Sequence, residues 1–290
     1  MTPTDIRDPP PSIHRVSMMK TILAACLLLL AAAVPARAHP GVGIVIDRQG
    51  SVFYTDLQHV WRIAPDGRKS IAVRDVHTHE LGLDAAGNLV GEDSEYLGGD
   101  RWRVRVWRRT PDGRVTDIIP WRDGFWREYG FVRDPAGATY WTQCPERRCT
   151  LRRRGADGRV TTVAPNVRWT SNIQFMAAAP DGSLIVVDGR DLRRIDRGGR
   201  VGTLARNVGE QLFGLWVDAR NHVYVAVYNT RSVLRVAPDG RVTTVARSPA
   251  PWGPSGVTVA PSGDLWLLEY NTSNEARVRR IRPDGRSTVY

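Results

Sequence analysis

The sequence contains little cysteine, lysine or histidine. Its 290 residues include three cysteines, two lysines and six histidines. So few cysteines exclude a small disulfide-dense scaffold and a zinc site built from four thiolates. The chain also has no Gly-x-Ser-x-Gly motif, and this absence argues against the nucleophile elbow of a serine hydrolase.

Long apolar runs are scarce as well, and the one that stands out covers residues 21–34. With about 14 residues it is too short to span a bilayer comfortably. Lys20 precedes the run and Ala36-Arg37-Ala38 follows it, which is the pattern of an export signal with a small-residue cleavage site. We therefore expect residues 1–38 to be removed and the mature chain to be periplasmic or secreted, without stable membrane insertion.

Two details of this leader leave alternatives open. Met18 or Met19 can also serve as the start of the protein. Leu23-Ala24-Ala25-Cys26 resembles a lipoprotein box, although most of the apolar run follows Cys26 instead of preceding it. We favour cleavage after Ala38 over lipid attachment at Cys26.

Beyond residue 38 the only cysteines are Cys144 and Cys149. An exported chain meets an oxidising compartment, where two cysteines this close in sequence are expected to form a disulfide. The rival interpretation is a zinc pair, but two thiols without neighbouring cysteines make a poor zinc site. The sequence therefore predicts a Cys144–Cys149 disulfide.

The chain is strongly basic, with a formal net charge of +11. Residues 1–38 contain four basic and two acidic residues, so the part that follows carries +9. Its arginines are spread along the repeats and no nucleic-acid-binding motif accompanies them. We expect a monomer with no nucleic acid partner.

A four-residue sequence, Pro-Asp-Gly-Arg, recurs along the chain. Proline and glycine supply the backbone angles, and aspartate the local hydrogen bond, that a tight turn needs. Counted from the second residue of each copy, the spacing is 41–46 residues, which is typical of propeller blades. Full copies stand at Pro65–Arg68, Pro111–Arg114, Pro238–Arg241 and Pro283–Arg286, and altered copies at Ala156–Arg159 and Arg197–Arg200.

Each repeat contains four short apolar stretches separated by turns, which we name strands a to d. Six such units predict an all-β fold over residues 39–290, namely a six-bladed β-propeller of four-stranded antiparallel blades. Because the first repeat begins with strand a and the last ends with strand d, blades one and six are expected to meet without strand exchange. The blades are expected at about 41–75, 76–121, 122–165, 166–206, 207–248 and 249–290.

The repeat unit resembles that of NHL-repeat propellers. The resemblance is clearest in Gly214-Leu215-Trp216-Val217-Asp218, Val223-Tyr224-Val225-Ala226 and Val233-Leu234-Arg235-Val236. It covers residues 41–290 and implies the same architecture. It says little about function, because propellers host many unrelated activities.

The two faces of such a propeller differ in their connections. Antiparallel strands put the a–b and c–d turns on one face, called the turn face here, and the b–c and d–a connections on the other, the loop face. Length varies most between strands b and c, with the largest insertion at Gly91–Arg101 of blade two. We therefore expect function at the loop face.

An arginine stands three residues before every turn of the Pro-Asp-Gly-Arg type. A residue repeated in all six blades indicates an architectural role, and we expect it to bridge blades or to stack on rings. The six are Arg62, Arg108, Arg153, Arg194, Arg235 and Arg280.

The d–a connection of blade two contains the candidate metal ligands His77, His79 and Glu80. In an extended chain, residues two apart point the same way, so both histidines can share one divalent ion or a substrate. Glu128 and Glu210, near the starts of neighbouring inner strands, are candidates for further ligands or for a catalytic base. A solvated pair of histidines explains the same pattern, and we favour that interpretation.

The repeat also departs from its own pattern on strand a. The glycine found at Gly43, Gly130, Gly214 and Gly256 is replaced by Glu80 in blade two and by Phe175 in blade four. Such a departure indicates that something other than folding selected the residue.

Aromatic and polar residues gather in the other d–a connections. Indole rings at Trp121, Trp126, Trp169 and Trp252 offer faces on which a sugar can stack, and wedging between blades is the structural alternative. The candidate ligand-binding residues are Trp126, Arg127, Tyr129, Asn172, Gln211 and Trp252.

Two enzyme families are similar in repeat style. Trp252-Gly253-Pro254-Ser255-Gly256 with Leu265-Trp266-Leu267-Leu268-Glu269 resembles the unit of streptogramin lyases. That family implies active-site histidines on late blades, where this chain offers only His222, beside an a–b turn. The senescence-marker and gluconolactonase family implies a metal held by Glu, Asn and Asp on inner strands, but Asn172 stands about two residues from the matching spacing and no Asp opens the inner strand of blade five. Neither active site is expected here.

Two functional hypotheses follow from these features. The first is an exported propeller that binds a small polar or sugar-like ligand, or an envelope protein partner, through its loop face and channel mouth. The second is a metal-assisted hydrolase or lyase of lactonase type, acting at the channel mouth. No cofactor is certain, and one divalent metal ion belongs to the second hypothesis only.

Overall fold

The computed structural model describes residues 40–290 except 125–131, 135, 144–147 and 170–174. Pro40–Tyr290 forms one compact unit. Its described residues form 24 strands, and no described helix has the length and apolar character of a membrane span. The predicted export signal, residues 1–38, lies outside the described residues.

The strands follow the predicted order, four to a repeat. Blades one to three contain β1 (Ile44–Ile46), β2 (Val52–Thr55), β3 (Val60–Ile63), β4 (Lys69–Val73), β5 (Leu81–Leu83), β6 (Leu89–Gly98), β7 (Arg101–Arg109), β8 (Val115–Asp123), β9 (Val132–Arg133), β10 (Thr139–Gln143), β11 (Arg148–Arg154) and β12 (Val160–Arg168). Blades four to six contain β13 (Met176–Ala178), β14 (Leu184–Asp188), β15 (Asp191–Ile195), β16 (Val201–Ala205), β17 (Leu212–Val217), β18 (Val223–Val227), β19 (Ser232–Val236), β20 (Val242–Arg247), β21 (Gly253–Val259), β22 (Leu265–Tyr270), β23 (Ala276–Ile281) and β24 (Ser287–Val289).

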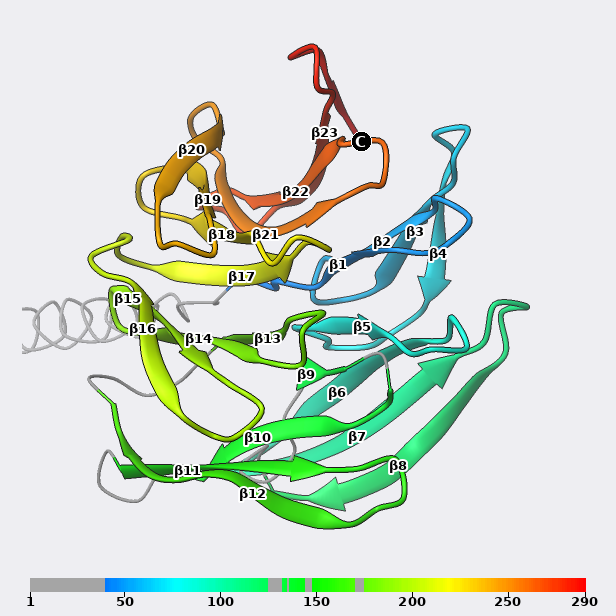
Figure 1. Cartoon of the computed structure of the whole chain (residues 1–290). Coiled ribbons are helices and arrows are strands. Elements are labelled where there is room, and N and C mark those ends of the chain that lie inside the picture. The colour runs from blue at the N-terminus through cyan, green and yellow to red at the C-terminus, as the bar shows by residue number, and fades with distance from the viewer. Residues whose placement is uncertain (1–39, 125–131, 135, 144–147, 170–174) are drawn as a thin grey trace, which may run out of the picture. The chain divides into compact units, whose positions relative to one another are not determined.

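Each blade is one antiparallel sheet whose strands pair in chain order, from β1-β2-β3-β4 to β21-β22-β23-β24 (Figure 1). The inner strands contact one another in a closed ring, β1 with β5, β5 with β9, β9 with β13, β13 with β17, β17 with β21, and β21 with β1. The predicted all-β, six-bladed propeller is therefore confirmed.

The Pro-Asp-Gly-Arg turns have the predicted geometry. In the first copy, Ala64 N donates to Arg68 O at 2.9 Å, and Arg68 N donates to Asp66 Oδ1 at 3.0 Å. An a–b turn lies beside it, because a Cβ on Gly50 would stand 3.9 Å from Pro65. The turn glycines have positive φ, 87° at Gly67, 100° at Gly113, 81° at Gly158, 81° at Gly199, 86° at Gly240 and 85° at Gly285.

The repeated arginines of strand c are architectural, but the contacts described for them stay within a blade. In blades one, four and six the guanidinium group binds the residue that follows the glycine of the a–b turn, and in blade three Arg153 binds Tyr140 OH, so these contacts join strands c and b where we expected bridges between blades. Arg280 also stacks on Trp266 at 5.4 Å, as expected. The bonds run from Arg62 Nε to Ser51 Oγ at 3.1 Å, from Arg194 Nε to Ser183 Oγ at 3.1 Å and from Arg280 Nε to Asp264 Oδ2 at 2.9 Å.

The insertion of blade two is not an irregular loop. Its residues lengthen β6 and β7, which pair from Leu89 and Arg109 up to Gly98 and Arg101. Strand β8 follows this extension as far as Asp123, opposite Arg103. The pairing shifts register between Tyr96 and Gly98 and on both sides of Val106. Elsewhere it satisfies the backbone of the inserted residues, so the extra length forms a sheet on the loop face.

The hydrophobic core lies between the blades. Phe53 and Val60 of blade one pack with Leu89 and Trp107 of blade two, and the other clusters likewise join neighbouring sheets. Successive side chains of a strand point to opposite faces of the blade, and each face meets a neighbouring blade. Strands such as β14 are therefore buried on both faces. Each blade is therefore held chiefly by its neighbours.

Blades six and one meet at the predicted seam. Among the described residues no backbone hydrogen bond crosses it, in keeping with the expected absence of strand exchange. Side chains bond to backbone instead, Ser255 Oγ to Gly41 O at 2.7 Å and Tyr270 OH to Thr55 O at 3.1 Å. The seam therefore depends on close side-chain and backbone contact.

Replacing Gly256 with alanine is expected to destabilise this seam. A Cβ at Gly256 would stand 2.4 Å from Val42 O, a backbone atom that cannot move aside cheaply. Overpacking of this kind typically lowers the free energy of unfolding by about 1–3 kcal/mol. Urea denaturation of Gly256→Ala measures the change. The control is Gly202→Ala on β16, where a Cβ meets nothing within 4 Å, and equal losses in both variants would contradict the interpretation.

Candidate functional site

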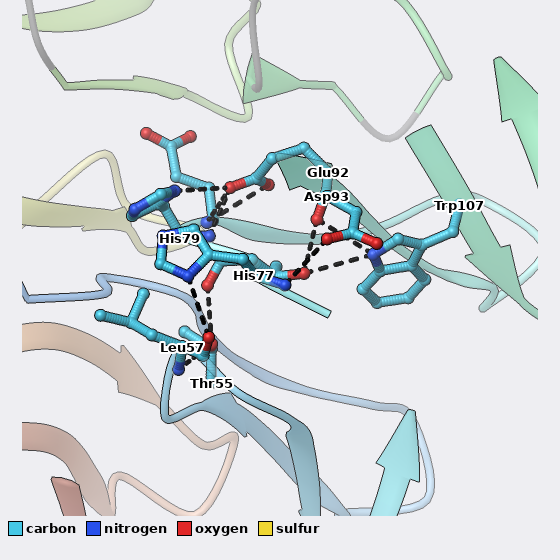
Figure 2. A network of polar contacts seen from close by, with 9 residues as sticks. Thr55, Leu57, His77, His79, Glu92, Asp93 and Trp107 are labelled. Atoms are coloured by element: carbon cyan, nitrogen blue, oxygen red, sulfur yellow. Dashed lines mark hydrogen bonds and ion pairs between the residues drawn. The ribbon is translucent and has the colours of Figure 1, made fainter. Parts of the chain in front are cut away.

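A buried carboxylate on β6 organises the d–a connection of blade two (Figure 2). Glu92 is 1% exposed, and its side chain accepts hydrogen bonds from the backbone N of His79 and of Glu80. His79 Nδ1 lies 3.3 Å from Glu92 Oε1. One carboxylate therefore fixes both the backbone of the connection and an imidazole ring.

Thr78 ties the same connection to both flanking blades. Its carbonyl oxygen accepts from Thr55 Oγ1 at 2.7 Å, which links it to blade one. Its hydroxyl donates to Glu92 O at 2.5 Å and accepts from Trp107 Nε1 at 3.2 Å. These four residues are buried, and a buried polar network with its partners in place is rigid.

The structure brings the two predicted histidines together. The rings of His77 and His79 are 4.6 Å apart between centroids and meet edge to face at 81°. His77 Nδ1 is 3.0 Å from Leu57 O, and His77 N donates to Asp93 Oδ1 at 2.9 Å. Burial, followed by the neighbouring His79, lowers the pKa of His77.

The metal hypothesis gains no ligand set from this geometry. The part of the chain that the structure describes has no group of three His, Cys, Asp or Glu side chains placed to hold a metal ion. His77, His79 and Glu80 therefore do not form a metal site by themselves. Glu210 is exposed and pairs with Arg190 at 2.7 Å, and Glu128 lies outside the described residues.

A cavity of about 290 Å³, the loop-face pocket, opens between blades one and two. Arg105 crosses its wall, paired with the buried Asp93 at 2.8 Å and placed over the ring of Trp121 at 4.9 Å. His77 lines the same pocket. The full lining is Leu57, Gln58, Asp75, Val76, His77, Asp93, Ser94, Glu95, Arg105 and Trp121.

A second cavity of about 200 Å³, the channel cavity, lies between the inner strands of five blades. The side chains described in its lining are mostly apolar and include Phe175, Met176 and Trp216. Glu80 lines it too, so the two departures from the repeat glycine, Glu80 and Phe175, both face this space. Burial raises the pKa of Glu80 to about 8, and the neighbouring Glu92 carboxylate adds to the shift.

The raised pKa of Glu80 makes stability depend on pH. The folded chain keeps the Glu80 proton up to about pH 8, whereas an unfolded glutamate loses it near its ordinary value. The folded state therefore binds more protons between these values, and stability falls as pH rises through them.

Glu80→Gln is expected to remove this loss. At about pH 9 the variant should exceed the wild type in free energy of unfolding by roughly 1–3 kcal/mol, since each pKa unit corresponds to about 1.4 kcal/mol and partial access to solvent reduces the effect. At about pH 5 the two proteins should be nearly equal. Urea denaturation at both pH values measures the difference, and a difference independent of pH would contradict the assignment.

The other predicted site residues have separate positions. Trp252 stacks under Arg277 at 4.1 Å, so one face of its ring is occupied. Gln211 is exposed and accepts a hydrogen bond from Tyr228 N at its carbonyl oxygen, at 3.1 Å. Cys149 is buried, while its predicted partner lies outside the described residues and the disulfide stays a prediction. The predicted site residues Trp126, Arg127, Tyr129, Asn172 and Cys144 all lie outside the described residues.

Sequence reasoning missed the buried acids that position these groups. An acid stands six residues after the glycine of the a–b turn in blades two, four and six, and each pairs with an arginine that lies over a tryptophan. That shared spacing is the signal that could have found them. The three sets are Asp93, Arg105 and Trp121; Asp188, Arg193 and Trp169; and Glu269, Arg277 and Trp252.

Comparison with known proteins identifies the architecture alone. No protein-family model and no curated protein matches the sequence. Solved structures with the same fold include a catalytically inactive virginiamycin B lyase from Staphylococcus aureus with quinupristin, at 16% identity and a TM-score of 0.55 over 89% of this chain and 86% of that one. They also include a gluconolactonase from Xanthomonas campestris, at 15% identity and a TM-score of 0.57 over 78% and 81%. A protein of unknown function from Bacteroides thetaiotaomicron has 13% identity and a TM-score of 0.61 over 88% and 71%.

These similarities establish the fold and assign no role to any residue. The chain is a six-bladed propeller with the fold that these lyase and lactonase structures share. His222, the one histidine after His79, lies in an a–b turn with its Nδ1 2.8 Å from Asp218 Oδ2. The closer assignment to NHL repeats stays a prediction.

Proposed function

We propose that this chain is an exported binding protein whose loop-face pocket holds a small polar, sugar-like ligand. The observation that carries the proposal is the lining of the pocket, where a half-buried ion pair, a histidine and an indole surround about 290 Å³. Export to the periplasm or beyond the cell belongs to the same proposal and rests on the leader sequence. A binding role requires no catalytic set, and none was recognised.

The chemistry of the lining suits a hydroxyl-rich ring. Carboxylate, guanidinium and imidazole groups supply acceptors and donors in fixed directions, which is how polar groups orient a ligand in a pocket. Asp93 is fixed by Arg105 on one oxygen and by His77 N on the other. The Trp121 ring, under the guanidinium groups of Arg103 and Arg105 at 4.5 Å and 4.9 Å, adds an aromatic part to the wall beside these polar groups.

Thermal unfolding with a panel of neutral sugars, uronic acids and polyols tests the proposal. A ligand present at about 100 times its Kd adds about 2.7 kcal/mol of stability, which raises the Tm by several degrees. His77→Ala should abolish the shift, because His77 lines the pocket. His222→Ala is the matched control on the turn face and should retain it.

Two outcomes would overturn the proposal. In the first, no member of the panel raises the Tm of the folded wild type. In the second, His77→Ala and His222→Ala lose the shift equally, which would place the ligand elsewhere. Binding of a protein from the cell envelope without any response to sugars would favour the partner-binding form of the hypothesis.

A further inference from the structure

The channel cavity has one charged group in an otherwise apolar lining. Among the described residues that line it, Glu80 carries the only formal charge, and the aromatic members are Phe175 and Trp216, which also pack against the clusters between blades. No lysine or arginine belongs to the described lining. In the described part of the chain, the side chains around this space of about 200 Å³ are therefore apolar apart from a single acid, and backbone groups complete its surface.

The repeat shows why this acid is unusual. At the equivalent ring position, Gly43, Gly214 and Gly256 allow neighbouring inner strands to approach, since a Cβ on any of them would stand within 3.0 Å of an adjacent strand. Glu80 occupies that position in blade two, and its side chain enters the central space. Glycine is sufficient for folding at this position of the ring, so the carboxyl group of Glu80 needs a different explanation.

No described cation neutralises the Glu80 carboxylate. Its nearest charged neighbour is Glu92, which raises the pKa of Glu80 further. Glu92 itself is engaged by His79 Nδ1 and by backbone N–H groups. The lining segments of β1, β13, β17 and β21 bring no other charge in the described part of the chain. Among the described residues, the lining therefore offers a positive ligand the Glu80 carboxylate and no basic side chain.

We infer that the channel cavity binds a small organic cation, an amine or quaternary ammonium with apolar substituents, through Glu80, Phe175 and Trp216. The carboxylate supplies the opposite charge, and aromatic faces attract ammonium groups by cation–π interaction. The size is adequate, because an apolar cavity of about 150 Å³ takes up benzene. This site is separate from the loop-face pocket and does not depend on the function proposed for it.

Titration calorimetry with tetramethylammonium, compared with neutral tert-butanol of similar shape, tests this site. Tetramethylammonium keeps its charge at every pH, so any change of affinity with pH comes from ionisation of the protein, here of Glu80. With the pKa of Glu80 at about 8, the ionised fraction and hence the affinity should rise about 30-fold between about pH 6.5 and about pH 9. Binding near neutral pH should release a proton, seen as a heat that varies with the ionisation enthalpy of the buffer.

Variants assign the effect to the carboxyl group. Glu80→Gln keeps the shape and removes the charge, and it should weaken tetramethylammonium binding at least about tenfold and abolish the rise with pH. Glu275→Gln, in the b–c loop of blade six, is the matched control and should bind as the wild type does. His77→Ala should also bind normally, which separates this site from the loop-face pocket.

The inference fails under any of three results. One is the absence of tetramethylammonium binding at about pH 9, beyond the effect of sodium chloride at the same ionic strength. Another is equal affinity for tert-butanol, and the third is unchanged affinity in Glu80→Gln. None of these results bears on the sugar panel, so the two proposals stand or fall separately.

Discussion

Replacing Glu92 with alanine is expected to lower the free energy of unfolding by about 3–5 kcal/mol, because each buried donor left without its acceptor costs about 1–3 kcal/mol. Glu92 is buried and accepts hydrogen bonds from two backbone N–H groups of the connection, while His79 Nδ1 lies 3.3 Å from it. Its removal would leave these donors buried without their acceptor. Urea denaturation at neutral pH measures the loss.

Glu95→Ala is the matched control on the same strand. Glu95 pairs with Arg103, and both side chains are 40% exposed or more, so its removal should cost about 0–1 kcal/mol. Glu92→Gln keeps an acceptor oxygen and should fall between the two. If Glu92→Ala were as stable as Glu95→Ala, the carboxylate would not organise the connection.

Glu269→Ala in blade six is expected to cost a similar amount, about 3–5 kcal/mol. Glu269 is fully buried and pairs with Arg277 at 2.7 Å and with Arg279 at 2.8 Å. Arg279 also donates to Arg247 O at 2.8 Å, which connects strand c to the end of β20. Without the carboxylate, two guanidinium groups would remain together with no counter-charge.

An exposed pair provides the comparison for Glu269. Glu210 and Arg190 are paired at 2.7 Å with more than half of each side chain exposed, so Glu210→Ala should change stability by about 0–1 kcal/mol. Adding Arg279→Met to Glu269→Ala should recover part of the loss by removing one of the two uncompensated charges. No recovery in the double variant would contradict the electrostatic explanation.

The fold could be predicted from the sequence because its turns are locally encoded. Each Pro-Asp-Gly-Arg turn needs only its own residues to form, as the Asp66 and Gly67 geometry illustrates. Their regular spacing fixes four strands to a blade, and strand direction then fixes which connections share a face. None of these features requires a contact between residues that are distant in sequence.

Part of the candidate site was predictable for a related reason. Glu80 and Phe175 replace a repeated glycine, and both line the channel cavity. The histidines of blade two were expected to lie together, and their rings are in contact. The two histidines and Glu80 do not form a three-ligand group in the described residues. Glu80 lines the channel cavity instead, and the sequence does not specify that direction.

The remaining features depend on register between strands. Glu92, Asp93 and Arg105 meet because β6 and β7 pair in one particular alignment, Asp93 opposite Arg105. The insertion at Gly91–Arg101 carries charged residues and three glycines, a composition more typical of a loop than of a strand. Pairing with β7 and β8 overrides that composition, because cross-strand partners satisfy the charges.

Hydrogen–deuterium exchange, with and without the sugar that most raises the Tm, tests the central claim that the loop-face pocket is the binding site. We expect added protection in peptides covering residues 57–58, 75–77 and 93–95, which contribute to the pocket. Peptides covering the turns at 64–68 and 110–114 should exchange unchanged. Protection confined to those turns, with none around the pocket, would contradict it.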